Sequence, residues 1–284
     1  MRFFWSVVAA LLTLPFWKSA NSQAVTLEQV KLQIEILARN SKWFFHDQLL
    51  QSGFSQDMAE KISNSIIFFY SYSPQTQILK TGTWVYIKKN VILTASHTLN
   101  EELALWWTIS TVNVSWKEAT GWAGIPYVFS SMPRTDLAFI MISGENMDYL
   151  DIASQASSEV MRLGFWNQQP TFITTERIKE SNVFWYILDH ANRDDMWIRW
   201  VPDGEEFWFT NAPTVWGDSW GPLLDQDWRV QGIAVATKYA KEVVNNKWMV
   251  AFANVGVFIP YDVIQKEYAL FIADARTSGF SIKE

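Results

Sequence analysis

The chain contains 284 residues, of which 49% are hydrophobic, so it is long enough to bury a large core. Its formal net charge of −6 argues against a nucleic-acid partner, because nucleic-acid-binding surfaces are usually basic. The lack of cysteine excludes both disulfides and a cysteine nucleophile, but it leaves the compartment open because exported proteins need not carry disulfides.

The first 24 residues have the features of an export signal. Met1 and Arg2 give a short positive start, residues 3–17 form an apolar run, and Ser22-Gln23-Ala24 matches a small-x-small cleavage pattern. The run is shorter than the ~20 apolar residues of a comfortable membrane span. We expect residues 1–24 to be a signal peptide, with an uncleaved membrane anchor as the alternative, and the protein to be secreted, periplasmic or membrane-anchored.

Residues 25–63 have a helical rather than a strand-like pattern. Thr26 and Gln29 form a capping box at the start of a first amphipathic helix, and a second, shorter helix is predicted to begin near Ser55. Apolar residues recur at helical spacing in both: Leu27, Val30, Ile34 and Leu37 in the first, Met58 and Ile62 in the second. Because an apolar helix face normally buries against something local, we expect an arm packed on the rest of the chain; a propeptide and an oligomerisation element are the alternatives.

From residue 64 onward the pattern predicts an all-β unit. Short runs rich in β-branched and aromatic residues are bounded by turn residues, which is typical of strands. In the first half these runs are Ile66–Tyr72, Trp84–Ile87, Val91–Thr94 and Leu137–Ile142, with a turn at Lys88-Lys89-Asn90. The second half begins near Val160 and includes Thr171–Thr175, Val183–Leu188, Met196–Val201, Val230–Ala236 and Met249–Ile259. A closing helix is predicted over Tyr261–Ala275.

Three short motifs flank these strands and carry the candidate chemistry. They are Thr94-Ala95-Ser96-His97, Arg134-Thr135-Asp136-Leu137-Ala138 and Gly217-Asp218-Ser219-Trp220-Gly221-Pro222. A serine hydroxyl is a weak nucleophile, so Ser219 needs a base such as His97 to take its proton. A carboxylate, here Asp136, would fix the imidazole tautomer and stabilise the imidazolium. The backbone N–H groups of Gly217 and Ser219 are candidate donors to the oxyanion.

These motifs resemble the T-A-A-H, T-D-L-A and G-D-S-G-G-P segments of trypsin-like serine proteases, and they occur in the chymotrypsin order. Residues 210–233 and Asn254–Pro260 also resemble the bacterial HtrA (Deg) branch. The resemblance covers about residues 65–265 and implies a serine endopeptidase that acts through an acyl-enzyme. It implies two perpendicular six-stranded β-barrels, the first over about 64–150 with His97 and Asp136, the second over about 155–260 with Ser219, and a C-terminal helix over 261–275. Because the chain ends soon after the second barrel, we expect it to have no PDZ domain of the kind that many HtrA proteins carry.

Tryptophan occupies positions at which the family has glycine. Trp220 follows the nucleophile, Trp84 lies in a G-S-G-type segment, and Trp228 lies at a hairpin tip where a type I′ turn would need positive φ at both central residues. The chain has 17 Trp and 12 Gly, whereas average usage of about 7% would give roughly 20 glycines. Two explanations are open: either these positions are encoded by UGA, which some genetic codes read as glycine and others as tryptophan, or the tryptophans are genuine. Genuine tryptophans would favour a catalytically impaired pseudoprotease that acts as a peptide- or protein-binding module.

A further departure concerns activation. Asp218 stands where the HtrA branch usually has asparagine, and no zymogen-type start precedes the first strand. The mode of activation therefore stays open.

Candidate specificity residues are uncharged. In the family, the residue six before the nucleophile lies at the base of the pocket for the side chain preceding the scissile bond, and here it is Pro213, beside Thr214. The wall formed by Val235, Ala236 and Thr237 is small and mainly apolar. We therefore expect polypeptide substrates cleaved after small or medium apolar residues. No cofactor or metal is expected, because no phosphate-cradling loop occurs and the three histidines lack ligand spacing.

Overall fold

The computed structural model describes much of the chain, with gaps. The described residues are 46–73, 78–96, 109–113, 127–131, 135–142, 147–166, 169–178, 208–210, 221–244 and 247–283. The predicted signal segment, the predicted first amphipathic helix up to residue 45, and the predicted strands Val183–Leu188 and Met196–Val201 lie outside them.

The second predicted helix is confirmed as α3 (Gln56–Ser65). Ser55 is its N-cap, and the Ser55 hydroxyl accepts a hydrogen bond from the Met58 N–H at 3.3 Å. Residues 46–51, just before it, are also helical. Leu49 and Ile62 are fully buried in the main core together with strand residues from both halves of the chain. The described part of the segment therefore packs on both halves of the chain.

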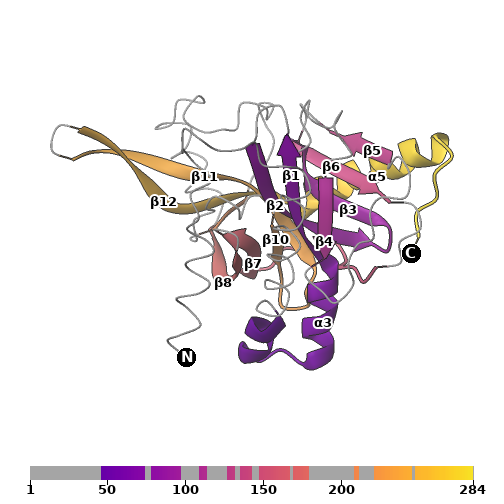
Figure 1. Cartoon of the computed structure of the whole chain (residues 1–284), viewed down its shortest axis with the longest axis horizontal. Helices are drawn as coiled ribbons and strands as arrows, with labels where there is room; N and C mark the ends of the chain where they lie inside the picture. Colours follow the sequence, from indigo (N-terminus) through magenta and orange to yellow (C-terminus); the bar gives the residue numbers. More distant parts are fainter. Residues whose placement is uncertain are drawn as a thin grey trace, which may run out of the picture.

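The first half of the chain forms a six-stranded antiparallel sheet with the order β4-β1-β2-β3-β6-β5 (Figure 1). Its strands are β1 (Ile66–Ser73), β2 (Ile78–Lys88), β3 (Val91–Ala95), β4 (Ile109–Asn113), β5 (Tyr127–Ser130) and β6 (Leu137–Met141). The four predicted strands are confirmed, whereas no sequence pattern singles out β4 or β5. Within the described residues no pairing joins β4 to β5, so this half is a sheet there and not the closed barrel that was expected.

The second half forms a closed antiparallel barrel with the order β10-β11-β12-β9-β8-β7. Its strands are β7 (Glu159–Trp166), β8 (Gln169–Ile178), β9 (Trp208–Thr210), β10 (Pro222–Leu224), β11 (Val230–Val244) and β12 (Lys247–Pro260). Pairing of β11 with β12 continues to Val244 opposite Lys247, so the two strands leave the barrel as a long ribbon (Figure 1). The predicted all-β, chymotrypsin-like fold class is confirmed.

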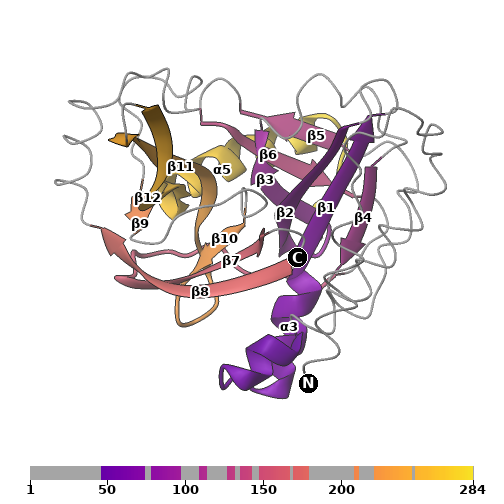
Figure 2. The same cartoon turned by 60° about the vertical axis from the view of Figure 1, so that its left-hand side comes forward.

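The predicted closing helix is confirmed as α5 (Tyr261–Thr277). It follows β12 of the barrel but lies beside β6 of the first sheet (Figure 2). Phe271 on α5 is fully buried, and its ring stacks on Phe139 of β6 with 5.2 Å between centroids and 17° between planes. The helix thereby joins the two halves through an aromatic contact. None of the helices in the described stretches is both long and apolar enough to cross a bilayer.

We expect Phe271→Ala to lower the free energy of unfolding by about 3–5 kcal/mol, because it removes a fully buried ring from the contact between the halves. Leu270, its neighbour in sequence, is 41% exposed, so Leu270→Ala should change stability by about 0.5 kcal/mol or less. Urea denaturation of both variants measures the difference. Similar losses for the two would contradict the placement of Phe271.

Candidate active site

Asp136 lies immediately before β6, beside the end of β3. The ladder between the two strands ends with Ala95 opposite Leu137. One step further, the Ser96 N–H donates to the Asp136 carbonyl oxygen at 2.6 Å. His97 lies outside the described residues but follows Ser96 directly. The sheet therefore places the start of the predicted histidine loop next to the predicted carboxylate residue.

A second contact supports the same junction. The Ser96 hydroxyl is hydrogen-bonded to the hydroxyl of Ser130, the last residue of β5. The family motif has alanine where this chain has Ser96, so this side-chain link is a feature of the chain itself. It connects the strand before His97 to the strand before the Asp136 loop.

Asp136 has a left-handed backbone. Its φ is +56°, and the only other positive-φ residue that is not glycine among those described is Trp228. Such a conformation costs about 1–3 kcal/mol, tends to cluster at active sites, and persists only where the surroundings impose it. The whole residue is only 7% exposed. Asp136 is therefore held in a conformation that its own backbone does not prefer.

Of the nucleophile motif, only its last two residues, Gly221 and Pro222, are among the described residues. Gly217 and Ser219 lie outside the described residues, whereas Gly221 lies at the barrel wall. A Cβ added to Gly221 would lie 1.9 Å from the Leu163 carbonyl oxygen on β7, so only glycine fits. On its other side, the Ala234 N–H of β11 donates to the Gly221 carbonyl oxygen at 3.1 Å. The end of the loop is thus fixed between two strands.

The predicted pocket wall begins next to this point. Val235 follows Ala234 on β11 and is partly buried. The backbones of Ala236 and Thr237 pair with Val257 and Gly256 of β12, while the predicted pocket-base residues Pro213 and Thr214 lie outside the described part. The wall segment and the exit of the nucleophile loop are therefore neighbours in the barrel.

Contacts between the halves involve the strands that carry the motifs. β3, which leads to His97, lies against β11, and β2 lies against both β7 and β10. β10 follows the nucleophile loop directly. The strands next to the histidine and serine segments in the sequence, β3 and β10, therefore both contact the opposite half of the chain.

The hairpin after β10 corrects one sequence prediction. Trp228 does have positive φ, +63°, but neither Gln226 nor Asp227 is among the positive-φ residues, so the turn is not type I′. The Trp228 N–H donates to the Asp225 carbonyl oxygen at 3.0 Å, and the Asp225 N–H donates to the Arg229 carbonyl oxygen at 3.0 Å. This pattern fits a three-residue loop in which a type I turn is followed by one left-handed residue. Only one position at the tip therefore favours glycine.

Two of the unexpected tryptophans are well packed. The Trp228 ring lies 4.3 Å from the Phe54 ring of the helical arm. Trp84 is fully buried and packs in a cluster with Ile67 and Tyr86 on one face of the first sheet. A glycine at either position would leave these contacts unmade. Trp220, the third, lies outside the described residues.

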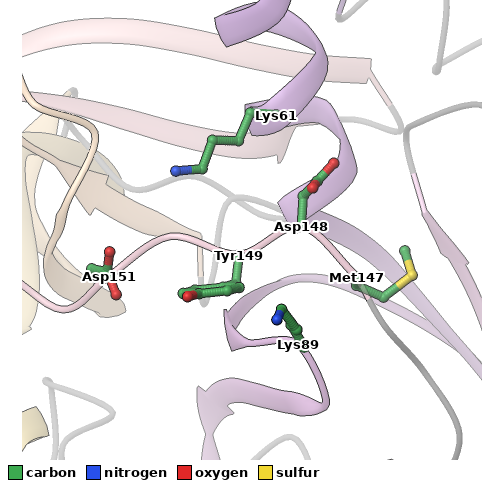
Figure 3. A pocket seen from close by; sticks show the side chains of 6 residues that line it. All are labelled: Lys61, Lys89, Met147, Asp148, Tyr149 and Asp151. Carbon is green, nitrogen blue, oxygen red and sulfur yellow. The ribbon is translucent and has the colours of Figure 1, made fainter. Parts of the chain in front are cut away.

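A polar cavity of about 210 Å³ lies between α3 and the connector of the two halves (Figure 3). It is lined by Lys61, Lys89, Met147, Asp148, Tyr149 and Asp151. Its carboxylates are paired, since Asn64 donates to Asp148 at 2.6 Å and Lys88 lies 3.6 Å from Asp151. Lys89 precedes the first residue of β3, whereas Ser96 follows its last, so the two residues lie at opposite ends of this strand. The cavity is therefore separate from the junction of Ser96 and Asp136.

Comparison with a protein-family profile gives one match. The profile described as "Trypsin-like peptidase domain" matches residues 81–233, which is more than half of the 284 residues. The match runs from β2 into β11 and includes the positions of His97, Asp136 and Ser219. No curated protein sequence matches the chain.

Three solved structures that resemble this chain are described as proteases. The active form of the Rv3671c protease from M. tuberculosis is 18% identical with a TM-score of 0.49, over 73% of this chain and 81% of that chain. The serine endoprotease from Yersinia pestis is 18% identical with a TM-score of 0.48, over 76% and 65%. The HtrA-type protease AlgW with tripeptide is 16% identical with a TM-score of 0.47, over 76% and 60%. At these identities the similarity concerns the fold.

We expect Asp136→Gly to be about 1 kcal/mol more stable than Asp136→Ala, because both remove the carboxylate but only alanine resists the left-handed backbone. Asp151, which is exposed and not among the positive-φ residues, provides the control: there the glycine variant should be no more stable than the alanine variant. Urea denaturation of the four variants measures both differences. Equal stability of the two Asp136 variants would contradict the strained conformation.

Proposed function

The chain belongs to the trypsin-like peptidase family, and we propose that it is a serine endopeptidase that hydrolyses peptide bonds through an acyl-enzyme. The observation that carries this proposal is the junction of β3 and β6. There the Ser96 N–H donates to the Asp136 carbonyl oxygen, and His97 is the next residue in the sequence after Ser96. Three motifs in the chymotrypsin order support the assignment of roles, as do the contacts of β3 with β6 and with β11, the strand paired with β10.

In the proposed reaction, Ser219 attacks the scissile carbonyl carbon while His97 takes the hydroxyl proton. Asp136 holds the imidazole in the required tautomer and stabilises the imidazolium. The N–H groups of Gly217 and Ser219 would stabilise the negative charge on the tetrahedral intermediate. His97 then protonates the leaving amine, and water hydrolyses the acyl-enzyme by the same route.

The alternative function is that of a pseudoprotease, and Trp220 is the observation that favours it. An indole next to the nucleophile would occupy space at which the family motif has glycine, on the side from which the leaving group departs. Such a chain would bind peptides or proteins without cleaving them. The codons for Trp84, Trp220 and Trp228 bear on this choice, because ordinary UGG at all three removes the recoding alternative.

We further propose that the substrates are polypeptides cleaved after small or medium apolar residues, and that the enzyme acts outside the cytoplasm. The first point is supported by the uncharged Pro213 and Thr214 and by the partly buried Val235 beside the loop exit. The second is supported by the signal-like pattern of residues 1–24.

We expect a fluorophosphonate probe to label the wild-type protein at Ser219 and to fail with Ser219→Ala. His97→Ala and Asp136→Ala should lower kcat on a peptide substrate about 10⁴-fold or more. His46 is a matched control, because it lies in the helical arm and bonds Gln56 at 3.2 Å, so His46→Ala should keep the wild-type labelling rate. A folded wild-type protein that resists labelling would favour the pseudoprotease.

A peptide-library digest tests the specificity. Cleavage should be concentrated after alanine, valine and similar apolar residues, because charged side chains would find no compensating charge in the predicted pocket. Mass spectrometry of the products, with Ser219→Ala as the background, gives the preference. A pattern dominated by cuts after Lys, Arg or Glu would refute the predicted pocket.

A further inference from the structure

The Ser131 hydroxyl contacts the residues on both sides of Asp136. It lies 2.7 Å from the Thr135 hydroxyl, 2.8 Å from the Leu137 carbonyl oxygen and 3.2 Å from the Leu137 nitrogen. Ser131 and Thr135 are each only 4% exposed. One buried hydroxyl therefore holds the chain immediately before and immediately after the carboxylate residue.

These contacts use the full hydrogen-bonding capacity of a serine. A hydroxyl has one proton to donate and two lone pairs to accept with. Ser131 donates to the Leu137 carbonyl, accepts from the Leu137 N–H, and accepts from the Thr135 hydroxyl. Backbone bonds reinforce the arrangement, since the Ser131 N–H donates to the Leu137 carbonyl at 2.9 Å and the Thr135 N–H donates to the Ser131 carbonyl at 3.3 Å. Alanine at this position would leave buried groups of both Thr135 and Leu137 without this partner.

The geometry matters because Asp136 lies between the two anchored residues with a φ of +56°. A left-handed residue that is not glycine persists only when its surroundings determine it. The hydrogen bonds of Ser131 to Thr135 and Leu137 hold the backbone on both sides of Asp136 and so maintain this conformation. Without the hydroxyl, residue 136 can return to a negative φ, which changes the direction of its side chain.

We propose that Ser131 is a positioning residue for Asp136, and that Thr135 assists it. The predicted effect on kcat rests on the proposed function, because a displaced Asp136 carboxylate lowers the rate only if His97, Asp136 and Ser219 form a working triad. In this role Ser131 acts through Thr135 and Leu137 on the backbone of Asp136.

The kinetic test compares Ser131→Ala with Ser65→Ala, another fully buried serine, whose hydroxyl donates to the Lys61 carbonyl inside α3 at 2.8 Å. We expect Ser131→Ala to lower kcat about 10²-fold with little change in KM, since small misplacements of a catalytic group have that effect. Ser65→Ala should change neither kcat nor KM, and an unchanged kcat in Ser131→Ala would overturn the proposal.

Rescue and coupling separate positioning from general destabilisation. Ser131→Thr keeps the hydroxyl and should restore most of the rate, while Thr135→Val removes one contact and should produce a smaller loss in the same direction. In an Asp136→Ala background, Ser131→Ala should lower kcat no further. The same fold-loss in both backgrounds would overturn the proposal, because Ser131 would then act elsewhere. If Ser131→Ala does not fold, Thr135→Val carries the same comparison.

A double-mutant cycle of Ser131→Ala and Asp136→Gly, measured as free energies of unfolding, tests the positioning role without any measurement of activity. In the wild type, loss of the hydroxyl lets residue 136 leave its left-handed conformation and recover part of the strain, whereas glycine adopts positive φ freely and has no strain to recover. Ser131→Ala should therefore destabilise the Asp136→Gly protein more than the wild type. Equal destabilisation would overturn the positioning role. If Asp136→Ala leaves kcat unchanged, the proposed function fails instead, and this cycle still decides the role of Ser131.

Discussion

The hydrogen bond between the Ser96 N–H and the Asp136 carbonyl oxygen is the contact on which the candidate site depends. It extends the β3–β6 ladder by one residue beyond Ala95 and Leu137, and so brings two sequence motifs together at one end of a sheet. A ladder of this kind fixes distance and direction at once, because each added bond inherits the register of the previous one. Backbone pairing of β3 with β6 therefore fixes the relative position of Ser96 and Asp136.

The rest of the fold keeps this junction in place. Phe139 lies on β6, three residues after Asp136, and the Phe271 ring of α5 stacks on it. Because α5 follows β12 directly in the sequence, the helix that packs on β6 is attached to the barrel of the second half. The main core includes side chains from the helical arm and from both halves, so no part of it is complete without the others.

The sequence predicts those parts of the structure whose cause is local. β3 and β6 are continuous apolar runs, Ser55 has the chemistry of an N-cap, and α5 has helical spacing, so each is visible in a short window. β10 is only three residues long and starts with Pro222, which is permitted at the first position of a strand but conceals it in a pattern search. Ser131 is also invisible, because its role comes from a loop that closes onto Leu137 and from the φ of Asp136, and serine is ordinary at any loop position. The single left-handed residue at the hairpin tip depends on loop length, which the dipeptide Asp227-Trp228 does not reveal.

Trp228 shows how backbone and side chain can favour different amino acids at one position. Its backbone conformation favours glycine, while its indole packs on Phe54 and ties the helical arm to the hairpin that continues the nucleophile loop. Either residue would leave the hairpin in the same shape. Only tryptophan makes the ring contact with Phe54, so the identity of residue 228 determines whether the tip of this hairpin is packed on the amino-terminal arm.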